Sequence, residues 1–171
     1  MATTFTRVPT PVGELTLTAS DSGLTGVYFP TSRRGPPPTE REDWVEADGR
    51  GPAGAVLARA RQQLAEYFAG TRTAFDVPLD PAGSAFERRV WDALRAIPYG
   101  ATLSYSALAR RLGDVRATRA VGTANARNPI PIIVPCHRVV GARGELTGFG
   151  GGLDRKRWLL EHEGALMKLG G

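Results

Sequence analysis

Short runs of alternating apolar and polar residues dominate the start of the chain. The runs are Phe5–Val8, Glu14–Thr18 and Leu24–Phe29, and the turn-forming triplet Asp21-Ser22-Gly23 separates the last two. Alternation with a period of two, bounded by turn residues, is typical of strands that bury one face. The pattern therefore predicts a small antiparallel meander.

Residues 30–79 predict a loop, then a helix, then a short strand. Residues 30–54 hold three consecutive prolines at 36–38, several glycines and mixed charges, which predicts a surface loop. Ala55–Phe68 places apolar residues at helical spacing, and Gly70 is expected to end that helix. Phe75–Leu79 is a short β-like run that contains a proline, which favours an edge strand.

Helical spacing dominates the chain after Asp80–Gly83, a segment with the composition of a linker. Ser84 followed by Glu87 is a capping-box pattern, because each residue can bond the backbone N–H of the other. The pattern opens a predicted helix that Pro98-Tyr99-Gly100 ends.

Four further elements are expected beyond that helix. Ser104 can cap a short helix closed by Gly113, and residues 115–126 form another, so the pair resembles a helix-turn-helix. The glycine-rich residues 141–152 predict a hairpin region. Leu153–Glu163 has the spacing of a last helix.

The most unusual run is Ile132–Val140, which is apolar, β-branched and contains the only cysteine of the chain. We expect a strand buried on both faces whose pairing stops at Pro135, with Cys136 where the chain leaves the sheet. A lone cysteine is commonly a small core residue. Here His137 and Arg138 can act as the cationic or hydrogen-bonding neighbours that stabilise a thiolate.

Cys136, His137 and Glu163 could together withdraw a proton from the thiol. Neighbours on an extended strand point to opposite sides, so we expect a water molecule rather than a direct contact between Cys136 and His137. Glu163 ends the last predicted helix, which could pack back on the strand. The alternatives are a strand-edge histidine bonded to backbone and a solvated carboxylate.

The helix at residues 115–126 has almost no side-chain bulk. Such a helix can approach a DNA minor groove, which is about 6 Å wide. Equally, it can pack tightly on another helix, and the sequence alone leaves both interpretations open. Its small residues are Ala117, Ala120, Gly122, Thr123, Ala124 and Ala126, and its arginines are Arg116, Arg119 and Arg127.

Charge and composition narrow the class of protein. Residues 1–83 carry a net charge of −2 and residues 84–171 a net charge of +7, so the second half suits a polyanionic partner. One cysteine excludes an internal disulfide, and with two histidines it makes a structural zinc site unexpected. No run is long and apolar enough for a membrane span or a signal peptide, so a cytoplasmic location is expected.

The run Pro135-Cys136-His137-Arg138-Val139 resembles the active-site signature of the O6-alkylguanine-DNA alkyltransferases, also called methylated-DNA–protein-cysteine methyltransferases. The resemblance extends from Phe86 to Gly164, and it is looser in the first half. The other matching segments are Ile97–Gly100, Ser104-Tyr105, Arg119–Gly122, Asn128-Pro129, Gly148–Leu153 and Trp158–Gly164.

The resemblance implies an α+β protein with two domains. Residues 1–80 would form a ribonuclease H-like α/β domain with a small antiparallel sheet. Residues 84–171 would form a winged-helix-like α domain that carries the helix-turn-helix and the alkyl acceptor. The implied activity is direct-reversal repair, in which a flipped O6-alkylguanine, or O4-alkylthymine, loses its alkyl group to the protein in one irreversible turnover. No cofactor or metal is implied, and the partner would be duplex DNA, with cooperative self-association on it.

The resemblance also implies roles for individual residues. Cys136 would accept the alkyl group, His137 would act as base through water, Glu163 would orient His137, and Asn128 would hold the turn before the cysteine. Four residues would contact the base, with the carbonyl of Cys136 assisting: Tyr105, Val139, Gly150 and Pro131. Arg119 would fill the space left by the flipped base. The remaining DNA-binding residues would be Arg116, Ala120, Gly122, Thr123, Ala124 and Asn125.

The chain departs from the better-known members of the family at two points. Phe149-Gly150 stands where a Tyr-Ser pair can occur, and the zinc ligands of some relatives are absent. A non-catalytic alkyltransferase-like lesion-binding protein is the main alternative, but such proteins lack the acceptor cysteine. A cysteine hydrolase that uses Cys136 and His137 is a second alternative, which the helix-turn-helix disfavours.

Overall fold

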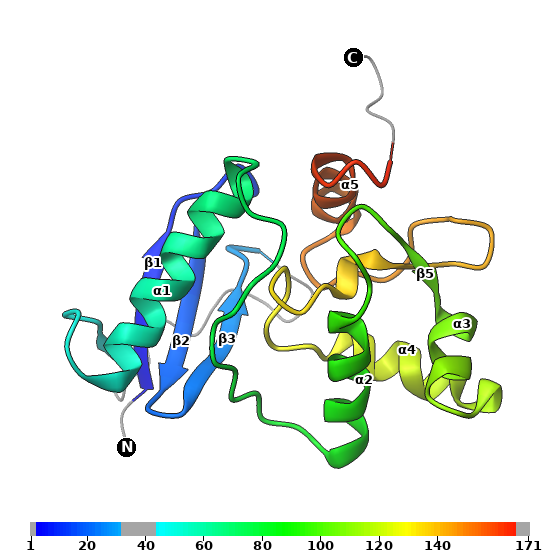
Figure 1. Ribbon diagram of the computed structural model, residues 1–171, viewed down its shortest axis with the longest axis horizontal. Helices are drawn as coiled ribbons and strands as arrows, with labels where there is room; N and C mark the ends of the chain where they lie inside the picture. Colours follow the sequence, from blue (N-terminus) through cyan, green and yellow to red (C-terminus); the bar gives the residue numbers. More distant parts are fainter. Residues whose placement is uncertain (1–2, 32–43, 167–171) are drawn as a thin grey trace. The chain divides into compact units, whose positions relative to one another are not determined.

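The computed structural model describes residues 3–31 and 44–166 of the 171-residue chain (Figure 1). The chain divides into two compact units, Met1–Ala82 and Gly83–Gly171.

The first unit contains a four-stranded sheet with the order β3-β2-β1-β4. Strands β1 (Thr3–Val8), β2 (Leu15–Ser20) and β3 (Gly23–Tyr28) form the antiparallel meander that the alternation predicts. Strand β4 (Trp44–Glu46) pairs with β1 in parallel. The predicted loop at 30–54 is therefore wrong at its end, while residues 32–43 lie outside the described residues.

Helix α1 (Gly51–Phe68) lies across this sheet (Figure 1). It begins four residues earlier than predicted and has Pro52 in its first turn. Proline is compatible with a helix start, because the N–H groups of the first turn have no carbonyl partner within the helix. Gly70 follows the helix with φ of +82°, as a helix-ending glycine does. The buried side of the helix includes Leu57, Ala60, Leu64 and Tyr67.

The predicted edge strand at Phe75–Leu79 is wrong. The segment touches the sheet through a single bridge to Leu24, whose N–H donates to the Pro78 carbonyl at 2.8 Å. Gln63 of α1 accepts the Asp76 N–H at 3.1 Å, so that donor faces the helix instead of a strand. The Gln63 side chain thus occupies the Asp76 N–H, and Pro78 has no N–H to donate. The segment therefore lacks the donors that a strand ladder needs.

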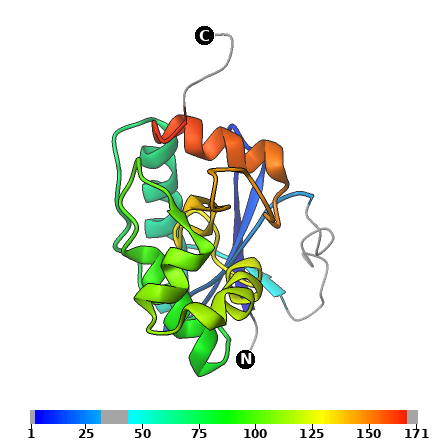
Figure 2. The same ribbon diagram turned by 90° about the vertical axis from the view of Figure 1, so that its right-hand side faces the viewer.

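The second unit is mostly helical (Figure 2). Its helices α2, α3 and α4 gather at one end and α5 lies at the other, with the chain from 127 to 140 between them in both views. The elements are α2 (Ala85–Arg95), β5 (Leu103–Ser104), α3 (Tyr105–Arg111), η1 (Val115–Ala117), α4 (Thr118–Ala126), η2 (Cys136–Arg138), β6 (Val139–Val140) and α5 (Leu153–His162).

Side-chain caps set the first helices of this unit. Ser84 accepts the Glu87 N–H at 3.1 Å and Glu87 accepts the Ser84 N–H at 2.9 Å, which confirms the predicted capping box. Ser104 accepts from Ala107 and begins α3 as predicted. The predicted helix at 115–126 starts with the 3-10 turn η1 before α4, because Asp114 caps that tighter turn.

The predicted strand over Ile132–Val140 is mostly wrong. Only Val139 and Val140 are extended, paired in parallel with β5, and Cys136–Arg138 form the 3-10 turn η2. Every residue from 131 to 140 is nevertheless buried. Burial, which β-branched residues favour in any conformation, was therefore predictable, whereas strand geometry was not. The predicted hairpin region at 141–152 contains no strands and has two separate turns, at 141–145 and 149–152.

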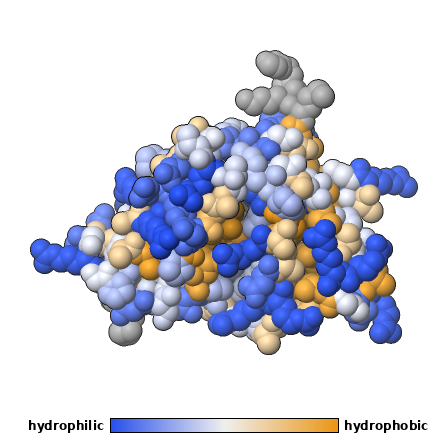
Figure 3. Space-filling model, viewed as in Figure 1, coloured by the Kyte–Doolittle hydropathy of each residue, from blue (hydrophilic) through white to orange (hydrophobic). Residues whose placement is uncertain are grey.

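Each unit has its own apolar core. In the second, Leu94, Leu108, Val121, Leu159 and Leu160 are fully buried. Hydrophilic side chains cover much of the face drawn in Figure 3, interrupted by smaller apolar patches. None of the helices in the described ranges has the length and apolar character that crossing a bilayer requires.

Replacing Ser84 by alanine is expected to lower the free energy of unfolding by about 1 kcal/mol, because the Glu87 N–H then loses its cap. Urea unfolding followed by tryptophan fluorescence measures the change. Thr102→Ala, at an exposed position of the same unit, is the control. Equal stability of the two variants would contradict the capping role.

Candidate active site

Two very tight turns lead into Cys136. The Ile133 N–H donates to the Pro131 carbonyl at 2.9 Å around Ile132, whose φ is +74°. The Cys136 N–H donates to the Val134 carbonyl at 2.8 Å around a proline with φ of −81° and ψ of 64°. These are γ-turns of the rare positive-φ type and of the common type. A β-branched residue at positive φ is strained, so its surroundings must hold it there.

Asn128 is the side chain that holds these turns. Its amide nitrogen donates to the Val134 carbonyl at 2.8 Å, and its oxygen accepts the Ile130 N–H at 3.0 Å. The side chain is buried, so losing either bond would leave a polar group without water. Asn128 thus ties together the two ends of the segment that precedes Cys136.

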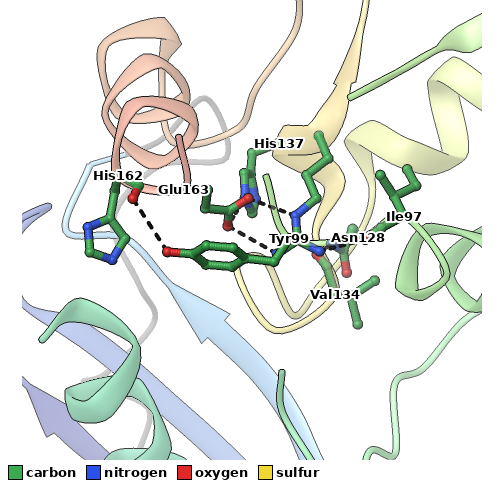
Figure 4. A network of polar contacts seen from close by, with 8 residues as sticks. Ile97, Tyr99, Asn128, Val134, His137, His162 and Glu163 are labelled. Atoms are coloured by element: carbon green, nitrogen blue, oxygen red, sulfur yellow. Dashed lines mark hydrogen bonds and ion pairs between the residues drawn. The ribbon is translucent and has the colours of Figure 1, made fainter. Parts of the chain in front are cut away.

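His137 and Glu163 form a fully buried ion pair or hydrogen bond, with 2.7 Å between Nε2 and Oε2 (Figure 4). Glu163 follows the last turn of α5 and faces His137 of η2. Since a carboxylate only accepts, Nε2 carries a proton when the imidazole is neutral, and Nδ1 keeps its lone pair. Nδ1 is buried and has no hydrogen-bond partner among the described residues. That nitrogen is therefore able to accept a proton.

Arg138 completes the arrangement around Glu163. Its guanidinium donates to both carboxylate oxygens, at 2.8 and 3.1 Å, and to the Ile97 carbonyl at 2.7 Å. It also lies 5.8 Å from the centre of the Tyr99 ring. From the sequence, Arg138 was expected only as a cationic or hydrogen-bonding neighbour of a thiolate. Its carboxylate partner lies 25 positions away, and no local pattern points to it.

These contacts set the protonation states of the pair. Burial lowers the pKa of His137 more than Glu163 raises it, so the imidazole is neutral at neutral pH. Burial alone raises the pKa of Glu163, but hydrogen bonds from His137 and Arg138 and the charge of Arg138 outweigh burial and bring it to about 2. The site therefore holds a permanent carboxylate beside a neutral base.

The residues expected to contact a base lie on several elements of the same unit. Tyr105 of α3 donates from its hydroxyl to the Thr147 carbonyl at 3.3 Å, and burial raises its pKa, so it stays protonated. Val139 and Pro131 are buried, and Gly150 is half-buried with room for a Cβ atom.

Lys156 is a buried residue of this region that the sequence analysis missed. Its ammonium group donates to the Val139 carbonyl at 2.7 Å and to the Thr147 carbonyl at 2.6 Å, and the residue has no exposed surface. Burial lowers the pKa of Lys156 to about 8. The sequence held one indication that Lys156 is buried. The lysine lies three positions before Leu159 on the expected last helix, and residues at this spacing lie on the same face of a helix.

Helix α4 has two different faces. Arg119, Ala120 and Thr123 are exposed and Gly122 is half-buried, as is suitable for a contact surface; Arg116, in η1, is also exposed. Ala124 and Asn125, which were also expected to bind DNA, are only 2% and 3% exposed in this structure. Their spacing from Val121 places them on the inner face of the helix. There the Trp91 indole nitrogen donates to the Ala124 carbonyl at 2.9 Å.

Residues 3–31 and 44–166 contain no group of three or more His, Cys, Asp or Glu side chains arranged to hold an ion.

Comparison with known families identifies the class of protein that this fold and site define. Residues 4–81 match the 6-O-methylguanine DNA methyltransferase ribonuclease-like domain, and residues 85–165 match the DNA binding domain of the same family. The chain belongs to the 6-O-methylguanine DNA methyltransferase family. The resemblance seen in the sequence is thereby confirmed, as is the α+β fold with a ribonuclease-like first domain and a helical second domain.

Individual relatives are similar over nearly the full chain. The methylated-DNA–protein-cysteine methyltransferase of Mycolicibacterium paratuberculosis is 50% identical, covering 93% of this chain and 91% of the relative. The constitutive enzyme of that name from Bacillus subtilis is 40% identical, covering 93% and 94%. The chain also resembles the crystal structure of Mycobacterium tuberculosis OGT in complex with DNA, with a TM-score of 0.82 and 47% sequence identity. The match covers 94% of this chain and 92% of that chain.

Because the pKa of Glu163 is depressed, the ionised carboxylate stabilises the fold above its unfolded pKa of about 4.3, and that stability is lost as the pH falls toward 2. Glu163→Gln is expected to be less stable than the wild type at neutral pH. The gap should shrink by about 2 kcal/mol between about pH 6 and about pH 3. Urea unfolding at each pH gives the gap, and Glu161→Gln on the same helix is the control. A gap independent of pH would contradict the assignment.

Proposed function

We propose that this protein repairs DNA by moving the alkyl group of O6-alkylguanine onto the sulfur of Cys136. The observation that supports this most is the only cysteine of the chain, buried beside a neutral histidine that a permanent carboxylate orients. The names of the relatives describe the same transfer to a protein cysteine. Because a thioether is not a leaving group, each molecule acts once.

The proton of the Cys136 thiol passes to Nδ1 of His137 through a bridging water molecule. Glu163 then stabilises the imidazolium, and Arg138 keeps that carboxylate ionised and fixed. The thiolate attacks the alkyl carbon in line with the leaving oxygen. The sulfur–carbon bond forms as the carbon–O6 bond breaks, and the electron pair goes to guanine, which takes up a proton and is restored. No cofactor enters the balance.

The base is recognised mostly by backbone groups. The carbonyls of Cys136 and Val139 accept from the guanine amino group, and the Gly150 N–H donates to O6. Tyr105 lies against the base, and Pro131 forms part of the wall. O4-alkylthymine presents a similar alkoxy group beside a ring nitrogen and is a second substrate.

The partner is duplex DNA that carries the lesion. The exposed face of α4 enters the minor groove, Arg119 occupies the stack that the flipped nucleotide leaves, and Arg116 contacts phosphate. The net charge of +7 in residues 84–171 and the DNA-bound structure of a relative support this binding. Several copies associate cooperatively along the DNA, and the protein acts in the cytoplasm.

The alternative is a protein that binds and flips the lesion without removing it. Cys136→Ser tests the choice, because the sulfur supplies the chemistry whereas α4 and the base contacts supply affinity. We expect no transfer from an O6-methylguanine oligonucleotide and lesion binding within a few-fold of wild type. Mass spectrometry of the wild-type peptide containing Cys136 should show a gain of one methylene group. An unmodified peptide, or transfer by the variant, would refute the proposed function.

Arg119→Ala is expected to slow repair of duplex DNA about tenfold at saturating DNA, which corresponds to about 1.4 kcal/mol. Repair of the free base O6-benzylguanine should change far less, because a free base has no stack to leave. Arg116→Ala removes the same charge from the neighbouring turn η1 and is the matched control. Its defect should vanish at saturation. An Arg119→Ala defect that also vanishes, or that is equal on both substrates, would contradict the finger role.

A further inference from the structure

Lys156 is a buried cation that the proposed proton transfer does not use. Lysine is almost never fully buried without an anionic partner, because removing an ammonium group from water is costly. Among the described residues, Lys156 forms no ion pair with a carboxylate. Its hydrogen bonds go to two backbone carbonyls instead. The charge itself therefore needs a partner.

The two carbonyls belong to segments that flank the proposed base contacts. Val139 lies in β6, and its own N–H donates to the Cys136 carbonyl, so Lys156 is linked to the cysteine turn through one residue. Thr147 lies in the glycine-rich segment 141–152, and its carbonyl also accepts from the Tyr105 hydroxyl. One ammonium group thus fixes the cysteine turn, this glycine-rich segment and α3 relative to one another.

Cys136 is the ionisable group whose negative charge acts on Lys156. A Cys136 thiolate raises the pKa of Lys156 against the larger effect of burial, and Lys156 in turn lowers the pKa of His137. The other charged groups of this region, Glu163 and Arg138, are paired with each other and with His137. Among the described residues no carboxylate neutralises the Lys156 ammonium group, and the Cys136 thiolate is an anion that acts on it.

We propose that Lys156 is a positioning residue for alkyl transfer, whose ammonium group ties the Val139 carbonyl to the Thr147 carbonyl and supplies the positive charge opposite the Cys136 thiolate. The inference rests on the proposed role of Cys136 as acceptor. His137 takes the proton, and Lys156 stabilises the anion that remains. Once the sulfur is alkylated it carries no charge, so Lys156 loses its electrostatic partner.

The first test measures the reactivity of Cys136 toward iodoacetamide as a function of pH, a reaction that needs neither DNA nor guanine. In Lys156→Met the midpoint of the pH–rate profile should rise by about one unit, so the rate below the midpoint falls about tenfold, because only the thiolate reacts. Lys156→Arg should restore part of the rate. Arg157→Met, an exposed neighbour that loses the same charge, should match the wild type. A less stable Lys156→Met protein with an unchanged midpoint would overturn the proposal.

The second test uses the wild-type chain and so does not depend on the folding of a variant. The sequence has two lysines, 156 and 168, so ¹⁵N-lysine labelling gives two side-chain signals, which Lys168→Arg assigns. Coupling is reciprocal, so a thiolate that Lys156 stabilises must also stabilise the ammonium group. The titration midpoint of Lys156 should therefore fall when iodoacetamide blocks Cys136. Identical midpoints would overturn the proposal even if repair of DNA is confirmed, whereas failed repair with a shifted midpoint would refute only the proposed function.

Discussion

The rest of the second unit depends on the hydrogen bonds that His137 and Arg138 donate to the buried carboxylate of Glu163. The carboxylate accepts from His137 of η2 and from Arg138, which in turn donates to the carbonyl of Ile97 beyond α2. A buried ion pair contributes little net stability, because desolvation offsets the attraction, but removing one partner is very destabilising. Its value here is specificity. The observed placement of α5 satisfies all three groups, and it also selects the tautomer of His137 that can take a proton.

The cysteine is held by strain as well as by charge. Ile132 has a positive φ, which a β-branched residue adopts only when neighbouring contacts compensate. Asn128 provides the compensation by bonding Ile130 and Val134, and burial of the segment removes water as a competitor. Site geometry is therefore fixed before any substrate arrives. Such preorganisation suits a protein that reacts once and gains nothing from rapid product release.

How far the sequence predicts this protein depends on the range of the interactions involved. Alternation predicted the meander, and the Ser84–Glu87 spacing predicted a capping box, because both depend on near neighbours. Residues 132–135 were predicted as a strand, since β-branched side chains signal burial but not the turn that Asn128 and two prolines impose. The bonds of Arg138 to Glu163 and of Lys156 to Val139 join distant positions, and no local spacing encodes them. The sequence indicated Glu163 and its partner His137, but the contact of Glu163 with Arg138 required the fold.

The inner face of the slim helix α4 confirms close packing on neighbouring helices, whereas contact of its outer face with a DNA groove stays a prediction. On the inner face, Ala124 lets the Trp91 indole of α2 reach a backbone carbonyl, which a larger side chain would obstruct. Toward α3, the Tyr105 ring lies 3.7 Å from where a Cβ atom of Gly122 would stand. The outer face keeps Arg119 and Thr123 exposed. Small residues thus seat the tyrosine expected to contact the base directly against the helix expected to contact DNA. A shift of α4 on binding would be passed to Tyr105 by contact, which links recognition of the duplex to the placement of the base.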